Sequence, residues 1–258
     1  MKKGFRILKF KKDNPIFEVK DISKSFDGRP VLKKLSLKVF PGECVGVLGP
    51  NGCGKTTSIG MMLGLITPTS GQIFINGIAL EPKSRIKLLS LMNFASPYIE
   101  LPKKLTVRQN LEVYARLYGV REIKQRTNEM IEDLNLQKFL NKKTGELSSG
   151  QKNRVALAKS LINKPKLLFL DEPTASLDPD VGDFVREYIE RYKRDNELTI
   201  LLASHNMREI ERLCDGIIMM KDGQIVDRGT SDQLIKKHGR ENLEDTFLKI
   251  ARSKNELE

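Results

Sequence analysis

One eight-residue segment constrains the fold of this chain more than any other feature. Gly49-Pro50-Asn51-Gly52-Cys53-Gly54-Lys55-Thr56 fits the pattern G-x-x-x-x-G-K-[ST]. It follows a short apolar run, Cys44 to Leu48, which is typical of a buried parallel strand, and it precedes helical sequence from Lys55 to Leu65. The alternative is a flexible turn that happens to contain glycine and lysine. A strand, a glycine-rich loop and a helix in that order favour a phosphate-binding loop.

The residue types of this loop suit the binding of phosphate groups. Glycines let the backbone approach the phosphates, while N–H groups and the helix N-terminus present fixed positive dipoles. Lys55 is expected to neutralise β- and γ-phosphate oxygens, and Thr56 to ligate Mg²⁺. Thr57 is counted with the nucleotide-binding residues of the same loop.

A second apolar run ends in two carboxylates. Leu167 to Leu170 predicts a strand, and Asp171 and Glu172 then fall at the carboxyl edge of the sheet, where ligands bind. We expect Asp171 to hold Mg²⁺ and Glu172 to orient and deprotonate the attacking water, a role worth roughly 10² to 10⁴ in rate. The alternative is a pair of solvated acids at the end of a strand before Pro173.

The order of the predicted elements indicates the fold class. Strands alternate with helices, which predicts an α/β fold: a P-loop NTPase core with a mostly parallel sheet, an antiparallel β subdomain near the N-terminus and an inserted α-helical subdomain. A hairpin is expected at Gln72 to Leu80, with Asn76-Gly77 as its turn, and residues 82–164 are expected to be mostly helical. The expected division is residues 1–95 and 164–230 for the core, 96–163 for the helical subdomain and 231–258 for a helical tail.

Composition excludes several classes of protein. No apolar run approaches the eighteen or so residues that a membrane helix needs. The three cysteines are scattered and only two histidines accompany them, so we set aside a protein-ligated metal site and place the chain in a reducing cytoplasm. The net charge of +12 would attract anions, although a lysine-rich solvated surface explains it as well. Residues 1–12 mix basic and apolar side chains and could bind anionic lipid headgroups.

With these motifs in place, the sequence resembles the ABC ATPase family from about Phe17 to Asp232. Leu147-Ser148-Ser149-Gly150-Gln151 looks like the family signature, with Ser149 where glycine is more usual. Ser148 and the free N–H groups of the following helix can make an anion site, whereas an ordinary serine helix cap is the alternative. The resemblance implies that this signature closes on ATP bound to the other subunit of a dimer.

Further matches follow the family order. Asp178, in Ser176-Leu177-Asp178, looks like part of the loop that communicates between the two sites, and His205 looks like the histidine that senses the γ-phosphate. Phe26 sits where the family places an aromatic ring against adenine, and a core phenylalanine is the alternative. The family's usual glutamine before the helical insertion is missing, and Ser96 aligns best with that place, which puts the usual metal contact in doubt.

The function implied by this resemblance is Mg²⁺-dependent ATP hydrolysis coupled to transport. The expected partners are a second ATPase subunit, identical or paired, and an integral membrane permease on another chain, with the ATPase bound peripherally at the cytoplasmic face of the membrane. The chain looks most like the ATPases of exporters. The alternative is a soluble ABC ATPase that acts on nucleic acid, ribosomes or cofactor assembly, which the positive charge would suit. Relatives that act on ribosomes usually carry two cassettes, whereas this chain carries one. No specific nucleic acid is therefore expected as a partner.

Cys53 carries a prediction of its own. It lies two residues before Lys55 and just ahead of a helix N-terminus, which favours a thiolate. Cys53 is therefore expected to be the most reactive thiol of the chain. The alternative is an inward-facing side chain that acts as a small apolar filler.

Overall fold

The fold is known from a computed structural model of the chain, which describes residues 14–97, 100–175 and 177–252. The basic segment 1–12 and Ser176, both singled out from the sequence, lie outside the described residues. None of the described helices is both long and apolar enough to cross a membrane.

A six-stranded sheet forms the centre of the molecule, in the order β10-β9-β3-β8-β7-β6. Five strands run parallel, and β10 pairs antiparallel with β9 at one edge. Their bounds are β3 Cys44–Leu48, β6 Met92–Ala95, β7 Leu167–Asp171, β8 Thr199–Ala203, β9 Gly216–Lys221 and β10 Gln224–Gly229.

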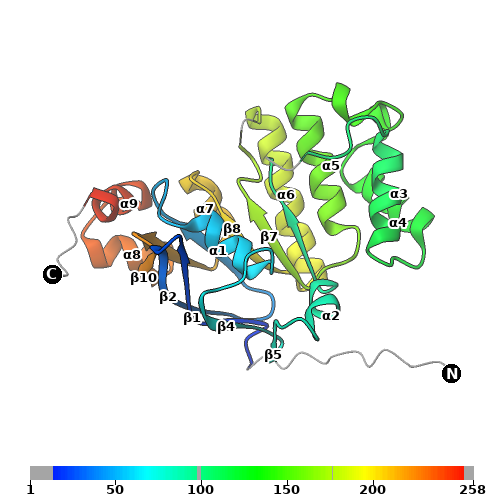
Figure 1. Ribbon diagram of the computed structural model, residues 1–258. Coiled ribbons are helices and arrows are strands. Elements are labelled where there is room, and N and C mark those ends of the chain that lie inside the picture. Colours follow the sequence, from blue (N-terminus) through cyan, green and yellow to red (C-terminus); the bar gives the residue numbers. More distant parts are fainter. Residues whose placement is uncertain (1–13, 98–99, 176, 253–258) are drawn as a thin grey trace.

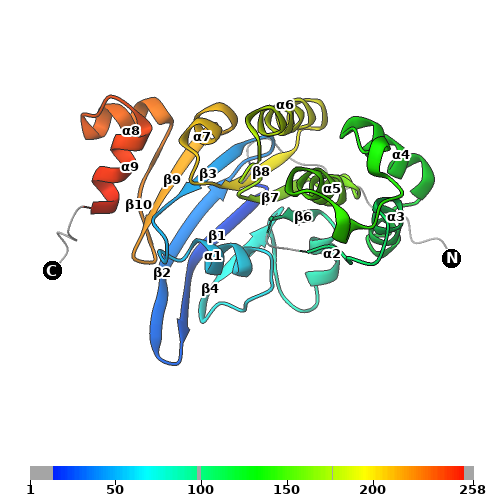
Figure 2. The ribbon, with the colours of Figure 1, turned by 90° about the horizontal axis from the view of Figure 1, so that it is seen from above.

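Side chains of this sheet alternate between two cores. Leu168 and Leu170 of β7 pack with Ile200 and Leu202 of β8 on one face, beneath the helices α5 (Ser149–Leu161), α6 (Pro179–Asn196) and α7 (Met207–Leu213). Phe169 enters the other core, which includes the helix α1 (Lys55–Met62). Both faces are therefore buried, which explains why these strands read as continuous apolar runs. Figure 2 shows α6 and α7 on one side of the sheet and α1 on the other.

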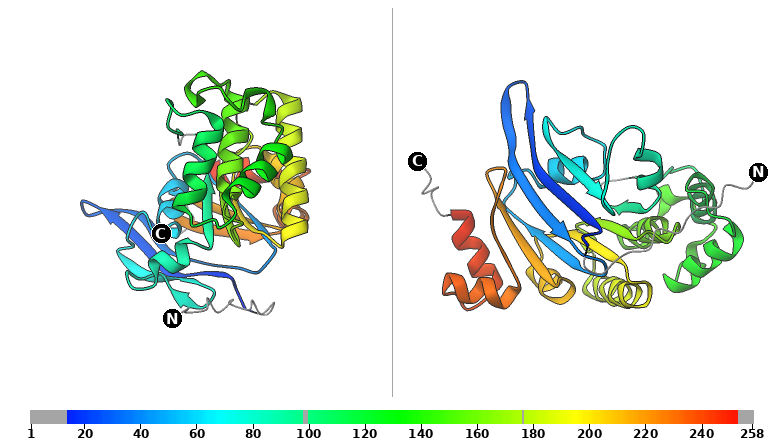
Figure 3. Two further views of the ribbon diagram at one scale, coloured as in Figure 1. Left: turned by 90° about the vertical axis from the view of Figure 1, so that its right-hand side faces the viewer. Right: turned by 90° about the horizontal axis from the view of Figure 1, so that it is seen from below.

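A second, antiparallel sheet covers the α1 side, in the order β2-β1-β4-β5. Its strands are β1 Phe17–Phe26, β2 Arg29–Val39, β4 Ser70–Ile75 and β5 Ile78–Ala79. The predicted β4–β5 hairpin is confirmed, and Asn76 and Gly77 both adopt positive φ, 51° and 74°, as its tight turn requires. Phe17 meets Phe169 of the central sheet edge to face at 5.7 Å. The β1–β2 hairpin extends beyond the body of the molecule (Figure 3).

Helices gather beyond strand β6, at the end of the molecule opposite the C-terminal helices (Figure 1). They are α2 Arg85–Leu89, α3 Val107–Leu117 and α4 Ile123–Asp133, with short 3₁₀ turns at Gln137–Phe139 and Thr144–Glu146 before α5. Thr106 caps α3 in a capping box with Gln109. The α8 (Ser231–His238) and α9 (Leu243–Arg252) helices close the chain beside β10.

The expectation that residues 82–164 are mostly helical is confirmed, with one short strand among the helices. Met92–Ala95 forms the edge strand β6, paired parallel with β7. These four residues, with polar Asn93 among them, show no alternation of apolar and polar side chains. Pairing with β7, rather than their own pattern, specifies the strand. α7 and β10 lie in stretches to which no element was assigned from the sequence.

Candidate functional site

The carboxyl ends of four parallel strands meet at one edge of the central sheet. β3 leads there into the loop Gly49–Gly54, and β7 ends in Asp171 and Glu172. β8 is followed by Ser204 and His205, and β6 by Ser96. The residues predicted from separate segments are thereby brought to a single edge, the place where open α/β sheets bind ligands.

The Gly49–Gly54 loop has the backbone that a phosphate cradle requires. Gly52 and Gly54 adopt positive φ, 79° and 100°, which side chains rarely allow. A Cβ on Gly49 would collide with the sulfur of Cys53 and lie 2.7 Å from the carbonyl oxygen of Met220. Each glycine is thus required by the shape of the loop, and Gly54 stands at the N-terminus of α1 with that helix's free N–H groups behind it.

The Gly49–Gly54 loop is also hydrogen-bonded to a distant part of the chain. The carbonyl oxygen of Cys53 accepts a hydrogen bond from the N–H of Gly223, at 3.1 Å, in the turn between β9 and β10. The carbonyl of Gly223 in turn accepts from the N–H of Lys33 in β2, at 2.9 Å. Gly223 has φ 77°, and a Cβ there would clash with the carbonyl of Val31. Only glycine therefore fits at this junction.

Lys55 reaches back over the loop. Its Nζ donates to the carbonyl oxygens of Gly49, at 2.5 Å, and Pro50, at 3.1 Å. Thr56 is exposed at the start of α1, while Thr57 beside it is half-buried. The ammonium group and the Thr56 hydroxyl thus belong to the same short stretch at the mouth of the loop, where a triphosphate and its cation would meet.

Asp171 and Ser96 lie together. The Ser96 hydroxyl donates to Oδ2 of Asp171 at 3.3 Å, because β6 and β7 are paired, Asp171 is the last residue of β7 and Ser96 directly follows β6. Burial and the neighbouring charge of Glu172 raise the pKa of Asp171, and Ser96 and Lys55 oppose that rise. A cation beside Asp171 would stabilise its ionised form.

Glu172 and His205 form a close pair. Oε2 of Glu172 lies 2.7 Å from Nδ1 of His205, and Oε1 accepts from the backbone N–H of His205 at 3.0 Å. The His205 side chain is 80% exposed and that of Glu172 only 13%, so the histidine covers the carboxylate from the solvent side. Glu172 also has φ 51°, a left-handed backbone that costs about 1–2 kcal/mol in a residue with a side chain. Such strain is typical of functional positions.

The predicted signature begins helix α5. Ser148 is the N-cap, and its hydroxyl accepts from the N–H of Gln151 at 3.3 Å in a capping box. Ser149 is exposed and Gly150 partly buried on the first turn. Asp178 is the exposed N-cap residue of α6, and its side chain makes no capping bond. The serine cap expected as the alternative for Ser148 is present, and the first turn of α5 has N–H groups without partners inside the helix.

A family model described as ABC transporter matches residues 32–175. The chain belongs to the ABC transporter family. The Nod factor export ATP-binding protein I of Rhizobium etli is 36% identical over 217 residues, which cover 83% of this chain and 68% of that protein. The ABC transporter ATP-binding protein NatA of Bacillus subtilis is 35% identical over 239 residues, covering 88% and 95%. A dimeric ATP-binding cassette in a post-hydrolysis state with ADP and Pi superposes with a TM-score of 0.77 at 26% identity, over 83% and 98% of the two chains.

As an ABC transporter subunit, the chain binds and hydrolyses ATP, and its fold is the P-loop cassette expected from the sequence. Phe26 lies at the end of β1, and its side chain is 45% exposed with Nζ of Lys24 4.9 Å from the ring centroid. The alternative of a core phenylalanine is therefore wrong. An exposed ring beside a cation leaves one face for another aromatic group.

The predicted reactivity of Cys53 is contradicted. Its side chain is 4% exposed and packs in the apolar core beneath the loop. Burial raises the pKa of the Cys53 thiol, and this outweighs the opposing effect of Lys55. The alternative, an inward-facing side chain that acts as a small apolar filler, is therefore what the ABC subunit contains.

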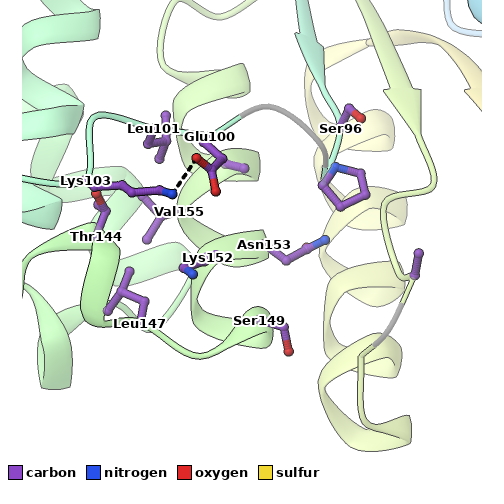
Figure 4. A pocket seen from close by; sticks show the side chains of 13 residues that line it. Ser96, Glu100, Leu101, Lys103, Thr144, Leu147, Ser149, Lys152, Asn153 and Val155 are labelled. Carbon is purple, nitrogen blue, oxygen red and sulfur yellow. Dashed lines mark ion pairs between the residues drawn. The ribbon is translucent and has the colours of Figure 1, made fainter.

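A cavity of about 380 Å³ lies beside this edge, between the loop after Ser96 and helix α5. Figure 4 shows Asn153 and Lys152 of α5 lining it, with Lys103 paired to Glu100 at 2.7 Å on the opposite wall. The sequence did not indicate this cavity. It also did not indicate Ser204, whose hydroxyl donates to Glu172 at 3.4 Å, although a serine directly before His205 was a possible signal.

Proposed function

We propose that this chain hydrolyses MgATP in a head-to-tail dimer and thereby drives a separate membrane permease. The observation that carries the proposal is the convergence of Lys55, Asp171 and the Glu172–His205 pair at one edge of the sheet. The similarity to a dimeric cassette bound to ADP and Pi supports the dimer.

In this proposal Lys55 leaves the carbonyls of Gly49 and Pro50 and binds the β- and γ-phosphates of ATP, while the loop N–H groups hold the remaining oxygens. Thr56 and Asp171 supply hydroxyl and carboxylate oxygens, the donors that Mg²⁺ prefers. Among the described residues no cluster of three or more acidic, histidine or cysteine side chains could hold a metal alone, so phosphate oxygens complete the set. Bound Mg²⁺ would neutralise charge that develops on the phosphates.

Glu172 then orients the attacking water and takes its proton. Oε1 and Oε2 are held by the His205 N–H and the His205 ring, so the carboxylate is fixed in direction before substrate arrives. The exposed His205 ring also stands where it can contact the γ-phosphate, which links the presence of that phosphate to the position of the base.

The remaining residues act across the dimer. Ser148, Ser149, Gly150 and Gln151 at the start of α5 bind the γ-phosphate of ATP held by the other subunit, and exposed Asp178 carries contact between the two sites. Phe26 stacks on adenine of the nucleotide bound by its own loop. The partner is a second copy of this chain or a paired ATPase subunit.

The membrane permease docks at the cavity beside Ser96, with the chain at the cytoplasmic face of the membrane. Residues 96–163 act as a helical unit that carries this contact, residues 1–95 and 164–230 as the ATP-binding unit, and residues 231–258 as a tail. Ser96 replaces a longer side chain, and its contact to Asp171 supports a direct link between the docking cavity and the metal ligand. The name of the Rhizobium etli relative favours export as the direction of transport.

The test is ATPase activity of Glu172→Gln and Lys55→Ala. Glu172→Gln is expected to lose about 10²-fold or more in kcat while still binding ATP and accumulating as a dimer, because closure remains possible and chemistry does not. Lys55→Ala is expected to lose ATP binding itself, measured by calorimetry. Glu187→Gln, an exposed charge change on α6, is the matched control. Wild-type turnover by Glu172→Gln would falsify the assignment of the base.

A further inference from the structure

A second carboxyl group is buried behind the Glu172–His205 pair. Glu209 lies in the first turn of α7 and is only 1% exposed. Its Oε1 accepts a hydrogen bond from the Thr174 hydroxyl at 2.7 Å. Among the described residues its Oε2 has no hydrogen-bond partner, although it is fully buried. A buried carboxylate in this condition is costly, whereas a protonated carboxyl group can donate a hydrogen bond.

The partners of Glu209 belong to the two loops that position the catalytic pair. Thr174 comes two residues after Glu172, and the Ser204 side chain is close enough to the Glu209 carboxyl to act on its pKa. Asn206 caps α7 by accepting from the N–H of Glu209 at 3.3 Å. Glu209 thus joins the loop after β7 to the loop after β8.

The hydrogen-bond capacity of Ser204 decides what Glu209 can do. The Ser204 hydroxyl has a single proton, and it donates that proton to Oε2 of Glu172 at 3.4 Å. Its oxygen accepts from the N–H of Asn206 at 3.1 Å, which leaves one lone pair. A protonated Glu209 can donate to that lone pair while its carbonyl oxygen keeps the bond from Thr174. An ionised Glu209 would instead compete with Glu172 for the only proton of Ser204.

Burial of Glu209 favours its protonated form. Burial is the largest effect and raises the pKa of Glu209, and the charge of Glu172 acts in the same direction. Bonds from Ser204 and Thr174 and the charge of Arg186 on α6 oppose the rise without cancelling it.

We infer that Glu209 is a positioning residue for ATP hydrolysis: as a neutral acid it donates to Ser204, accepts from Thr174, and so directs the Ser204 hydroxyl and the loop of His205 toward Glu172. This inference rests on the proposed role of Glu172 as the base. It assigns no contact between Glu209 and ATP.

The test compares Glu209→Gln with Glu209→Met. Glutamine has a donor and an acceptor at the same places as the neutral acid, so kcat is expected to stay within about threefold of the wild type. Methionine has a similar size and neither group, so kcat is expected to fall about tenfold or more with the KM for ATP unchanged. Thr174→Val is expected to lower kcat in the same direction, and to add little in combination with Glu209→Met, because both remove one network.

Thermal unfolding separates this role from a purely structural one. Glu209→Met removes a buried carboxyl group but leaves the Thr174 hydroxyl without its acceptor, and because these two effects oppose each other, its melting temperature is expected to stay close to the wild-type value while kcat falls. Glu211→Met, an exposed position on the same helix, controls for the change in side-chain type. Equal kcat for the Gln and Met variants, or a fall in kcat that tracks a fall in melting temperature, overturns the inference. If Glu172→Gln is inactive and Glu209→Met fully active, only this inference fails; if Glu172→Gln is active, the proposed base fails.

Discussion

Replacing Lys159 by methionine is expected to stabilise the protein at neutral pH and to change how its stability depends on pH. Lys159 lies on α5, and burial lowers the pKa of its ammonium from 10.5 to about 8. Its Nζ donates to Oδ1 of Asn93 and to the carbonyl of Phe94, both at a long 3.4 Å. It also lies over the rings of Tyr114 and Tyr118, 5.3 and 5.7 Å from their centroids.

The magnitude follows from these contacts. The fall in pKa corresponds to about 3 kcal/mol of unfavourable free energy when Lys159 is protonated in both the folded and unfolded states. Two cation–π contacts at a partly exposed position return about 0.5–1 kcal/mol each. The net cost is thus about 1–2 kcal/mol, and Lys159→Met should raise the free energy of unfolding by that amount at pH 7.

The sign of the pH dependence is fixed by the direction of the shift. Below about pH 8 the group is charged in both states and the cost is complete. Between about pH 8 and 10.5 the unfolded state binds more protons than the folded state, so the stability of the wild type rises with pH relative to the variant. Above about pH 10.5 Lys159 is neutral in both the folded and unfolded states, so the cost of burying its charge no longer separates the wild type from the variant.

Urea unfolding of the nucleotide-free protein at pH 7, 8, 9 and 10 measures this difference. Subtracting the unfolding free energy of the wild type from that of the variant at each pH cancels the contribution of the tyrosines and other titrating groups that both proteins share. Lys152→Met, an exposed lysine on the same helix, is the control for helix propensity. A difference between wild type and Lys159→Met that stays constant over this pH range would refute the reasoning.

Two further predictions concern the phosphate loop and the dimer. A small maleimide should leave Cys53 unmodified in the folded protein and modify it in urea, because the thiol is buried and its pKa raised; rapid labelling without urea, seen by mass spectrometry, contradicts this. Ser148→Arg should bind ATP as a monomer yet lack turnover, and mixing it with inactive Lys55→Ala should restore phosphate release, since the mixed dimer keeps one site made of two unaltered halves. Mixtures that stay inactive at all concentrations would count against the shared site.

Most of the site was predictable because its residues stand directly after strands that the sequence marks by their apolar runs. Lys55, Asp171 and Glu172 need only the strand before them, and the parallel order of β3, β8 and β7 then brings them to one edge. The helix cap at Ser148, given as the alternative to an anion site, could be read from the sequence because a capping box is local to four residues.

The features that escaped prediction depend on contacts between distant segments. Met92–Ala95 is a strand because β7 lies beside it, and its own residues do not show this. The inward direction of Cys53 follows from the turn of the loop against the sheet, which a motif does not specify. Glu209 has the ordinary sequence of an acid in the first turn of a solvated helix, and only the packing of α7 shows that it is buried.

The junction at Gly223 has a consequence for how the protein is made. The phosphate loop is encoded early in the chain, yet its Cys53 carbonyl accepts from the N–H of Gly223, whose own carbonyl accepts from the N–H of Lys33 in β2. During synthesis the loop residues leave the ribosome long before Gly223 does. The strands β8 and β9, which flank β3, are also synthesised after the loop. We therefore expect the phosphate loop to reach its final conformation only after the β9–β10 turn has left the exit tunnel. Until then α1 and its loop lack this hydrogen bond and the two strands beside β3, so a chain truncated before Gly223 is expected to bind nucleotide more weakly.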